Sequence, residues 1–361
     1  MSRPFGMSNA SLLKAGWALA RPLLHRLDPE RAHDLTLQAL KYAPLPAPAP
    51  DDPSLKVEAF GLTFANPIGL AAGFDKNGAI AHKAHLLGFG FAEIGTLTPR
   101  PQAGNPKPRL FRLPEEQAVI NRFGFNNLGH EHAARTLKKA ACVLGINIGA
   151  NKDASDRVAD YVSGIHAFSG LADYFTINVS SPNTPNLRDL QKPEALDDLL
   201  ARVLGARDSL TQKFGRTPVL LKIAPDLSLG ELDGIVKVAR AKKIDGMIVS
   251  NTTITRPGAT AQDRAGLEAG GLSGKPLFPL ATRMLAATYL RVDRQFPLVG
   301  VGGVDSAGTA LAKIEAGATL VQLYSALVFH GPGLIATIKQ GLAVRDLAAA
   351  VGSKAADWAK V

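Results

Sequence analysis

Short apolar runs alternate with longer helix-like stretches along most of the chain. Eight runs of seven or eight residues are rich in apolar and β-branched side chains, the pattern of strands buried on both faces. The predicted strands are Pro67–Gly73, Phe89–Gly95, Val143–Gly149, Tyr174–Ser180, Pro218–Ala224, Ile244–Asn251, Pro297–Gly303 and Thr319–Ser325. Between them lie predicted helices that include Ala79–Leu87, Glu131–Ala141, Ala195–Lys213, Leu229–Lys243, Leu280–Arg294 and Ser306–Ala316. Eight strand and helix repeats predict an α/β fold, a parallel (β/α)₈ TIM barrel.

Two stretches between predicted strands are longer than such a barrel needs. A (β/α)₈ barrel commonly takes about 250 residues, and here it has roughly 300. The surplus lies mainly in Thr96–Asn127 and Thr252–Phe278, which are predicted to be long loops.

The first 50 residues have a different pattern. From Met1 to Leu27 apolar residues recur at three- and four-residue steps among basic residues, with no acidic residue. Only six uncharged residues separate Lys14 from Arg21, too few for a membrane span of about 20 apolar residues. A second helix is predicted from the N-cap residue Asp28, followed by Pro29 at the first helical position.

This segment ends in a linker with a proline at positions 44, 46, 48 and 50. We therefore expect residues 1–50 to form an amphipathic helical hairpin and linker, and residues 51–361 the barrel. A cationic hairpin with an apolar face predicts contact with a membrane surface. Two alternatives stay open: a helical decoration packed on the barrel, and a targeting role for residues 1–27, which imitate a transit peptide.

Composition narrows the classes of function. The 361 residues carry 41 Lys and Arg against 31 Asp and Glu, but no run of five basic residues occurs, which argues against nucleic acid as a partner. The single cysteine, Cys142, excludes an intramolecular disulfide and a cysteine-held metal or iron–sulfur site. Two close histidine pairs, His82 with His85 and His130 with His132, are expected on solvated faces, so no metal site is predicted.

Catalytic residues of such barrels lie at the carboxyl ends of the strands, and here those ends are polar or glycine-rich. Gly302, Gly303, Tyr324 and Ser325 are the ends of the last two predicted strands, where barrels hold a phosphate group. Asp305 stands where the dinucleotide fingerprint requires its third glycine, so a mononucleotide is favoured over NAD. Tight turns alone are the alternative explanation for these glycines.

Two lysines are predicted to face the same barrel mouth. Lys76 and Lys222 can stabilise negative charge on a cofactor or on a carboxylate substrate. A barrel lysine can instead form a Schiff base, which leaves an aldolase-type lyase as the alternative function.

Asparagines form a second polar set near these strand ends. Their amides suit a planar ligand with adjacent ring N–H and C=O groups, although a single asparagine is more often a turn or cap residue. The set is Asn121, Asn147, Asn178, Asn183 and Asn251.

Ten motifs give the chain a specific resemblance. They are NPIGLAAGFDKNG, EIGTLTPRPQAGNPKPRLFRL, NRFGFNN, GINIGANKD, INVSSPNTPNLR, LKIAPDL, SNTT, GGLSGKPL, PLVGVGG and VQLYSAL, together with the N-terminal LDPERAHDLTLQAL. From about Leu27 to Pro332 the chain resembles the quinone-linked (class 2) dihydroorotate dehydrogenases.

The resemblance implies an FMN-containing enzyme that oxidises dihydroorotate to orotate in pyrimidine synthesis. It further implies that electrons pass to a membrane quinone at the cytoplasmic face of the inner membrane, with no iron–sulfur subunit. The residues implied for FMN are Ala72, Gly73, Phe74, Asp75, Lys76, Thr96, Asn147, Asn178, Lys222, Ser250, Gly274, Gly303, Tyr324 and Ser325. Those implied for the substrate are Lys76, Asn121, Arg122, Phe123, Gly124, Phe125, Asn178, Asn183, Asn251 and Thr252.

The resemblance assigns the catalytic base to Ser181 in the SSPN motif. Without it, Ser181 reads as a turn hydroxyl, and the sequence does not show where its proton goes. The soluble branch of the family uses a cysteine base, but Cys142 precedes a strand and so belongs to the opposite end of the barrel. Phe74 and Phe123 depart from the family pattern and are expected to alter packing near FMN only.

Overall fold

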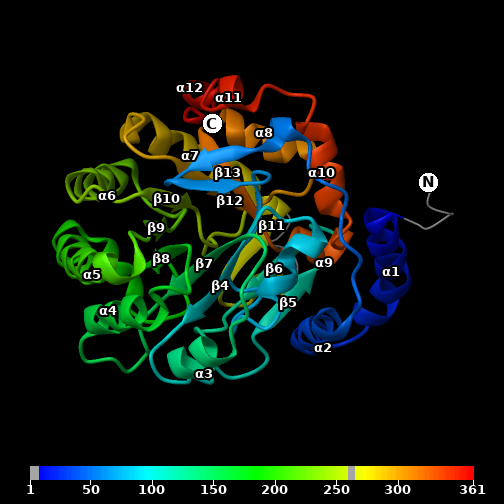
Figure 1. Cartoon of the computed structure of the whole chain (residues 1–361), viewed down its shortest axis with the longest axis horizontal. Helices are drawn as coiled ribbons and strands as arrows, with labels where there is room; N and C mark the ends of the chain where they lie inside the picture. The colour runs from blue at the N-terminus through cyan, green and yellow to red at the C-terminus, as the bar shows by residue number, and fades with distance from the viewer. Residues whose placement is uncertain (1–7, 259–264) are drawn as a thin grey trace.

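The computed structural model describes residues 8–258 and 265–361. Its centre is a closed barrel of eight parallel strands in the order β10-β12-β13-β3-β4-β7-β8-β9, which confirms the predicted TIM barrel (Figure 1). Each strand falls within or overlaps one of the eight predicted runs. The strands are β3 (Ile68–Leu70), β4 (Phe91–Leu97), β7 (Val143–Ile148), β8 (Tyr174–Asn178), β9 (Val219–Ile223), β10 (Gly246–Val249), β12 (Leu298–Val301) and β13 (Ala318–Leu323).

Helices surround the barrel, and four of them coincide with predicted ones. They are α5 (Pro193–Phe214), α6 (Leu229–Ala241), α7 (Phe278–Val292) and α8 (Ala307–Glu315), followed by the C-terminal α9 (Ala326–His330), α10 (Leu334–Leu342), α11 (Leu347–Ala350) and α12 (Ala355–Trp358). Two predictions need correction. The predicted helix Ala79–Leu87 is a 3₁₀ helix, η2 (Ala81–Leu87), and Glu131–Ala141 is the shorter α3 (Gly129–Thr136), which ends as Leu137 turns extended.

Like α9, α10, α11 and α12, the helix α4 (Arg157–Phe168) is not among the predicted helices. It begins where the Asp156 carboxylate accepts a hydrogen bond from the backbone N–H of Ala159. Its buried face includes Tyr161 and Phe168, which pack into the main core around the barrel.

A β-hairpin closes the amino-terminal end of the barrel. Its strands β1 (Val57–Ala59) and β2 (Leu62–Phe64) carry Phe64, whose ring meets that of Phe91 inside the barrel at 5.3 Å between centroids. Phe64 and Phe91 belong to an inner cluster that also contains Leu220 and Ile248. The interior is therefore packed at this end, and the opening lies at the carboxyl ends of the strands.

The two predicted long loops contain strands, which corrects that prediction. β5 (Leu110–Leu113) and β6 (Ala118–Asn121) come from the first loop and β11 (Gly271–Gly274) from the second. They form an antiparallel sheet in the order β11-β6-β5. Pairing across two segments far apart in the sequence leaves no local signal, because strand pairing depends on tertiary contacts.

The N-terminal segment forms the predicted helical hairpin of α1 (Asn9–Leu24) and α2 (Pro29–Tyr42) (Figure 1, right). Asp28 caps α2 as expected, because its carboxylate accepts the N–H of Arg31. None of the side chains of α1 is buried, and Leu19 and Leu23 are 79% and 65% exposed. Among the described helices, none is long and apolar enough to cross a membrane.

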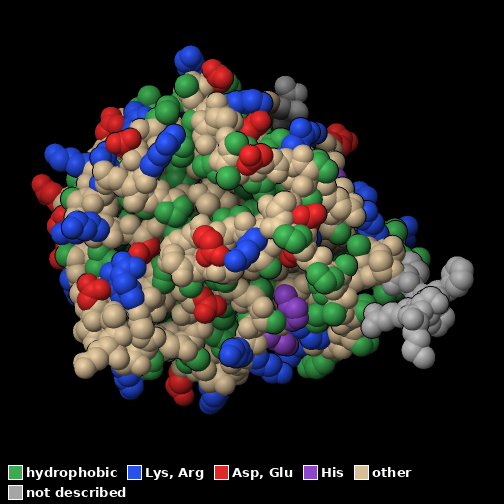
Figure 2. Space-filling view, turned by 45° about the horizontal axis from the view of Figure 1, so that its top comes forward, with side chains coloured by type: hydrophobic (Ala, Val, Ile, Leu, Met, Phe, Trp, Pro, Cys, Tyr) green, Lys and Arg blue, Asp and Glu red, His purple; other side chains and the backbone are tan. Residues whose placement is uncertain are grey.

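Two further observations concern titratable side chains away from the barrel mouth. His130 is buried against the ring of Phe168, contrary to the expected solvated position, and burial lowers its pKa to about 4. Burial raises the pKa of Cys142 to about 11, as expected for an unreactive thiol. On the face shown in Figure 2, basic and acidic side chains are interspersed rather than gathered by sign.

Candidate active site

A cavity of about 890 Å³ lies at the carboxyl ends of the barrel strands. It continues from the strand ends, past the sheet of β5, β6 and β11, to the inner faces of α1 and α2. Most predicted site residues line it: Ala72, Gly73, Phe74, Lys76, Thr96, Asn121, Phe123, Gly124, Phe125, Asn178, Ser181, Asn183, Lys222, Ser250, Asn251, Thr252, Gly274, Gly303, Tyr324 and Ser325. One chamber thus joins the polar barrel mouth to the apolar hairpin.

Lys222 enters the cavity floor from β9, and its side chain is almost fully buried. Its closest anionic atom is an Oε1 of Glu93, 3.9 Å from Nζ, too long for a hydrogen bond. Burial lowers the pKa of Lys222, and the Glu93 charge opposes that shift. Because no carboxylate lies within hydrogen-bond distance of the Lys222 ammonium, the ammonium is available to stabilise negative charge on a ligand.

Glu93 itself is fully buried within β4 and anchors the polar floor of the barrel. Its carboxylate accepts hydrogen bonds from Asn147 Nδ2 (2.7 Å), Tyr174 OH (3.1 Å), Thr176 Oγ1 (3.1 Å) and Gln322 Nε2 (2.9 Å). Donors from the three strands β7, β8 and β13 therefore satisfy a charge that would otherwise be costly to bury.

Above this floor, three strand-end side chains form a hydrogen-bonded set. Thr96 Oγ1 donates to Asn147 Oδ1 at 2.6 Å, and Asn178 Nδ2 donates to Thr96 Oγ1 at 2.9 Å. The Asn178 carboxamide oxygen accepts from Ser180 Oγ and lies 3.4 Å from the Asn251 amide nitrogen. These bonds fix the orientation of the amides that face the cavity.

Lys76 follows β3 and meets the hairpin directly. Its Nζ lies 3.3 Å from Nε2 of His33 on α2 and 4.2 Å from the centre of the Phe123 ring. Burial lowers the pKa of Lys76 to about 8. The pKa of His33 lies well below its usual value, because the ring is buried and faces the Lys76 charge. A neutral His33 can accept a hydrogen bond from the Lys76 ammonium.

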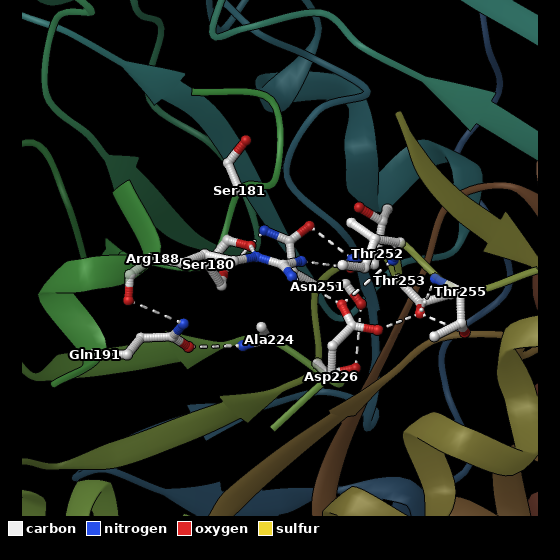
Figure 3. A network of polar contacts seen from close by, with 12 residues as sticks. Ser180, Ser181, Arg188, Gln191, Ala224, Asp226, Asn251, Thr252, Thr253 and Thr255 are labelled. Atoms are coloured by element: carbon white, nitrogen blue, oxygen red, sulfur yellow. Dashed lines mark hydrogen bonds and ion pairs between the residues drawn. The ribbon is translucent and has the colours of Figure 1, made fainter. Parts of the chain in front are cut away.

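Ser181 lies on the loop after β8, which Figure 3 shows beside a polar network formed by Arg188 and Gln191 of the same connection and by the loops after β9 and β10. Arg188 donates to the Ser180 carbonyl at 3.1 Å, to Asp226 at 2.8 Å and to the Thr252 carbonyl at 3.2 Å. The Ser181 side chain points away from this network and is 6% exposed (Figure 3). Its Oγ accepts the backbone N–H of Asn183 at 3.2 Å, which leaves the hydroxyl proton free to be donated.

Asn183 connects the Ser181 loop to the small sheet. Its Nδ2 lies 3.1 Å from the backbone carbonyl and 3.3 Å from Oδ1 of Asn121 at the end of β6. Asn105 Nδ2 in turn donates to the Asn183 carbonyl at 3.1 Å. The asparagines predicted for a planar ligand thus come together from separate segments of the chain.

The opposite end of the cavity is formed by glycine backbone. Gly302 and Gly303 have φ of +102° and +75°. A Cβ atom at Gly303 would lie 2.5 Å from Cβ of Phe278, so a side chain there has no room. Nearby, Ser325 Oγ donates to Ser273 Oγ at 2.7 Å. Bare backbone and hydroxyl groups of this kind suit a phosphate group.

Comparisons with known proteins agree with this geometry. Residues 54–345 match the family model for dihydroorotate dehydrogenase. The chain belongs to the dihydroorotate dehydrogenase family. It is 59% identical to a dihydroorotate dehydrogenase (quinone) of Bradyrhizobium diazoefficiens and to one of Rhodopseudomonas palustris TIE-1, covering 92% of each chain in both cases. It is similar to the crystal structure of a DHODH from Eimeria tenella in complex with ferulenol, with TM-score 0.85 and 36% identity over 91% of this chain and 96% of that one.

Three residues implied by the family resemblance do not line the cavity. Asp75 is buried beneath it, and its carboxylate accepts the backbone N–H groups of Ala79 and Ile80. Asn147 lies one layer below, between Thr96 and Glu93. Arg122 faces away and binds Glu268 at 2.6 Å. Their direct ligand contacts stay a prediction, whereas the structure gives each a role in holding a loop or a neighbouring amide.

Several residues of this dehydrogenase fold escaped the sequence analysis. Glu93 was visible only as one acidic residue inside the apolar run FAEIG. Glu30 and His33 lie in the LDPERAH motif, which predicts a helix start and contributes to the family resemblance but gives no sign of a site residue. In the structure Glu30 forms a buried ion pair with Arg109 at 2.7 Å, which joins the hairpin to the barrel loop. Arg112 adds bonds to the carbonyls of Leu24 and Leu27.

Proposed function

We propose that this protein oxidises dihydroorotate to orotate in pyrimidine synthesis, with FMN as its prosthetic group and a membrane quinone as electron acceptor. The observation that carries the proposal is the single cavity from Ser181 and the asparagines to the inside of the hairpin. Substrate and quinone can each reach one region of that cavity. FMN, when bound, supplies the chemistry of accepting two electrons from one partner and passing them to the other.

The residues present fit FMN. Lys222 offers a buried cation with only a distant partner, and Gly302 and Gly303 offer backbone that approaches a phosphate closely. Thr96 and Asn178 add fixed polar groups between these two regions. These residues suit a ligand whose flat ring lies at the cavity floor and whose phosphate lies against Gly302 and Gly303.

Ser181 accepts the proton that leaves the substrate carbon next to its carbonyl group, and releases its own hydroxyl proton to water in the same step. The loop position is held by Arg188 below it and by the Asn183 N–H on its oxygen. Asn121, Asn183 and Asn251 orient the planar substrate through ring N–H and C=O groups. Lys76 stabilises the carboxylate of the substrate, since its ammonium faces the cavity.

Residues 1–50 form the quinone entrance on the cytoplasmic face of the inner membrane. The hairpin lines the cavity with Leu13 and Ala20, and Leu23 lines it as well while remaining 65% exposed. Leu19, 79% exposed, does not line the cavity. Lys14 and Arg21 on α1 are exposed as well and suit anionic headgroups. A long-tailed quinone can then enter from lipid without crossing water.

Steady-state turnover tests the proposal. The purified protein, mixed with dihydroorotate and a long-tailed quinone in detergent, is expected to form orotate and quinol in a 1:1 ratio, measured by absorbance and chromatography. Borohydride treatment with substrate is expected to leave no covalent adduct on Lys76 or Lys222. A trapped lysine adduct without orotate formation would support the aldolase-type alternative instead.

A further inference from the structure

Lys313 is the buried cation that the proposed reaction leaves unused. It lies on α8, and its side chain is 0% exposed. Its Nζ has no hydrogen-bond partner among the described residues and lies over the Phe278 ring, 4.9 Å from the ring centroid. An amine buried without a counter-ion is costly unless something else completes its surroundings.

The position of Lys313 relates it to the glycine loop after β12. A Cβ atom at Gly300 would lie 3.2 Å from Cβ of Lys313, so the lysine begins against the base of the GVGG segment. Its other end reaches Phe278, whose Cα and N lie 2.7 and 2.8 Å from a Cβ placed at Gly303. The Lys313 side chain therefore runs behind the loop proposed to hold phosphate and does not line the cavity itself.

No described carboxylate competes for this amine. On α8, Glu315 binds Lys354 at 2.9 Å. On α7, Arg283 is exposed and Arg291 binds Asp233. Other charged side chains nearby are exposed or have partners of their own. Asp305, before α8, is half-buried and accepts a hydrogen bond from the Thr309 hydroxyl. Asp357 on α12 is exposed, and Lys339 on α10 forms an ion pair with Asp51. Burial alone lowers the pKa of Lys313 well below its usual value.

We propose that Lys313 is a positioning residue for the cofactor phosphate: it takes up a proton when the phosphate dianion binds at Gly302 and Gly303, and its charge then holds the dianion through the loop. This inference rests on the proposed function, because FMN supplies the phosphate. The physical reason is mutual: the dianion stabilises the ammonium, and the ammonium offsets the cost of desolvating the dianion.

The first test measures protons on the unmodified protein. The full-length chain is stripped of flavin and titrated with FMN at about pH 8, where the phosphate is already a dianion, in buffers of different ionisation enthalpy. Calorimetry is expected to show uptake of up to about one proton per FMN. Riboflavin, which lacks the phosphate, is expected to bind with no uptake. Equal uptake for both flavins, or none for FMN, would overturn the proposal.

The second test compares variants by flavin affinity. Lys313→Met is expected to weaken FMN binding by about tenfold or more, with riboflavin affinity changed less than about twofold, and to abolish the proton uptake. Lys313→Arg is expected to retain preference for FMN without uptake, and exposed Lys237→Met to behave as wild type.

If Lys313 only supports the fold, a different result is expected. In Lys313→Met the FMN and riboflavin affinities would fall together, or the proton uptake would persist. Either result would contradict the proposal. If Lys313→Met does not fold, the proton measurement on the unmodified chain decides alone. Failure of the unmodified protein to bind any flavin would instead reject the proposed function itself.

Discussion

At the scale of single residues, Ser181 is predicted to carry the chemical step. Ser181→Ala is expected to retain FMN and bind orotate, but to reduce flavin on the order of 10²-fold more slowly, the usual weight of a general base. Ser181→Cys is expected to keep part of the activity, because a thiol loses its proton more readily. Stopped-flow bleaching of the flavin by dihydroorotate measures both rates. An alanine variant as fast as wild type would reject the assignment.

Lys76 gives the site a predicted pH dependence. Its pKa of about 8 means that the ammonium is present below that pH and is lost above it. Orotate affinity is therefore expected to fall above about pH 8, by at most about tenfold per pH unit. Lys76→Met is expected to bind weakly at every pH, and exposed Lys139→Met to follow the wild-type curve. Flavin difference spectra during orotate titration measure the affinity. A wild-type orotate affinity that stays constant up to pH 10, about two units above the pKa, would contradict this role of Lys76.

The site residues that the barrel rule alone could predict lie at the end of a recognisable strand, whereas those in the two long loops came only from the family resemblance. Lys222 and Asn178 end apolar runs, so the barrel rule places them at its mouth. Glu93 and His33 could not be assigned, because their roles depend on partners from other segments. Glu93 is anchored by side chains of β7, β8 and β13, and His33 meets Lys76 only once α2 has docked.

At the scale of elements, the Glu30–Arg109 pair holds α2 against the barrel. Both side chains are 8% exposed, and Lys107 approaches Glu30 at 3.3 Å. Glu30→Gln leaves Arg109 without its carboxylate, which costs about 3 kcal/mol for a broken buried pair. Amide exchange in α2 is therefore expected to accelerate by about two orders of magnitude, with α5 unchanged. Asp233→Asn, which breaks the more exposed pair with Arg291, is expected to leave α2 exchange as in wild type.

The same pair predicts loosening of the hairpin in acid. Burial alone would raise the pKa of Glu30, but the hydrogen bonds and charge of Arg109 and Lys107 bring it below the usual value. The stabilisation is then complete above the unfolded-state pKa and is lost as the pH falls through the folded-state pKa. Below about pH 4.5, the protection of α2 amides, measured against the unfolded-chain exchange rate at the same pH, should fall in wild type and not in Glu30→Gln. An equal loss of protection in both proteins would contradict the role of the Glu30 carboxylate.

The predicted elements match the structure where the local sequence alone determines the secondary structure. The eight strands of the barrel are continuous apolar runs, and Asp28 with Pro29 marks the start of α2. The sheet of β5, β6 and β11 could not be found, because β6 pairs with a strand from a distant loop. The 3₁₀ form of η2 was also hidden, since its composition suits an α-helix equally well.

At the scale of the whole molecule, the exposed side of the hairpin is predicted to bind lipid. Replacing both Leu19 and Leu23 with Gln removes two exposed apolar side chains and is expected to weaken binding to anionic vesicles at least tenfold, at about 1 kcal/mol for each side chain. Dihydroorotate-driven flavin reduction should stay unchanged. The control is Leu290→Gln, on α7, where the side chain is 50% exposed. Cosedimentation with vesicles measures binding, and wild-type binding by the double variant would reject the hairpin as the membrane contact.

One cavity is proposed to join the two half-reactions. An anaerobic two-step mixing experiment on the full-length protein tests it directly, with flavin absorbance at about 450 nm as the signal. Dihydroorotate is expected to bleach the absorbance with formation of one orotate per flavin, and a long-tailed quinone added afterwards to restore it. Three results would contradict the proposed function. The protein carries no flavin, dihydroorotate does not bleach the flavin, or the quinone does not reoxidise the bleached flavin.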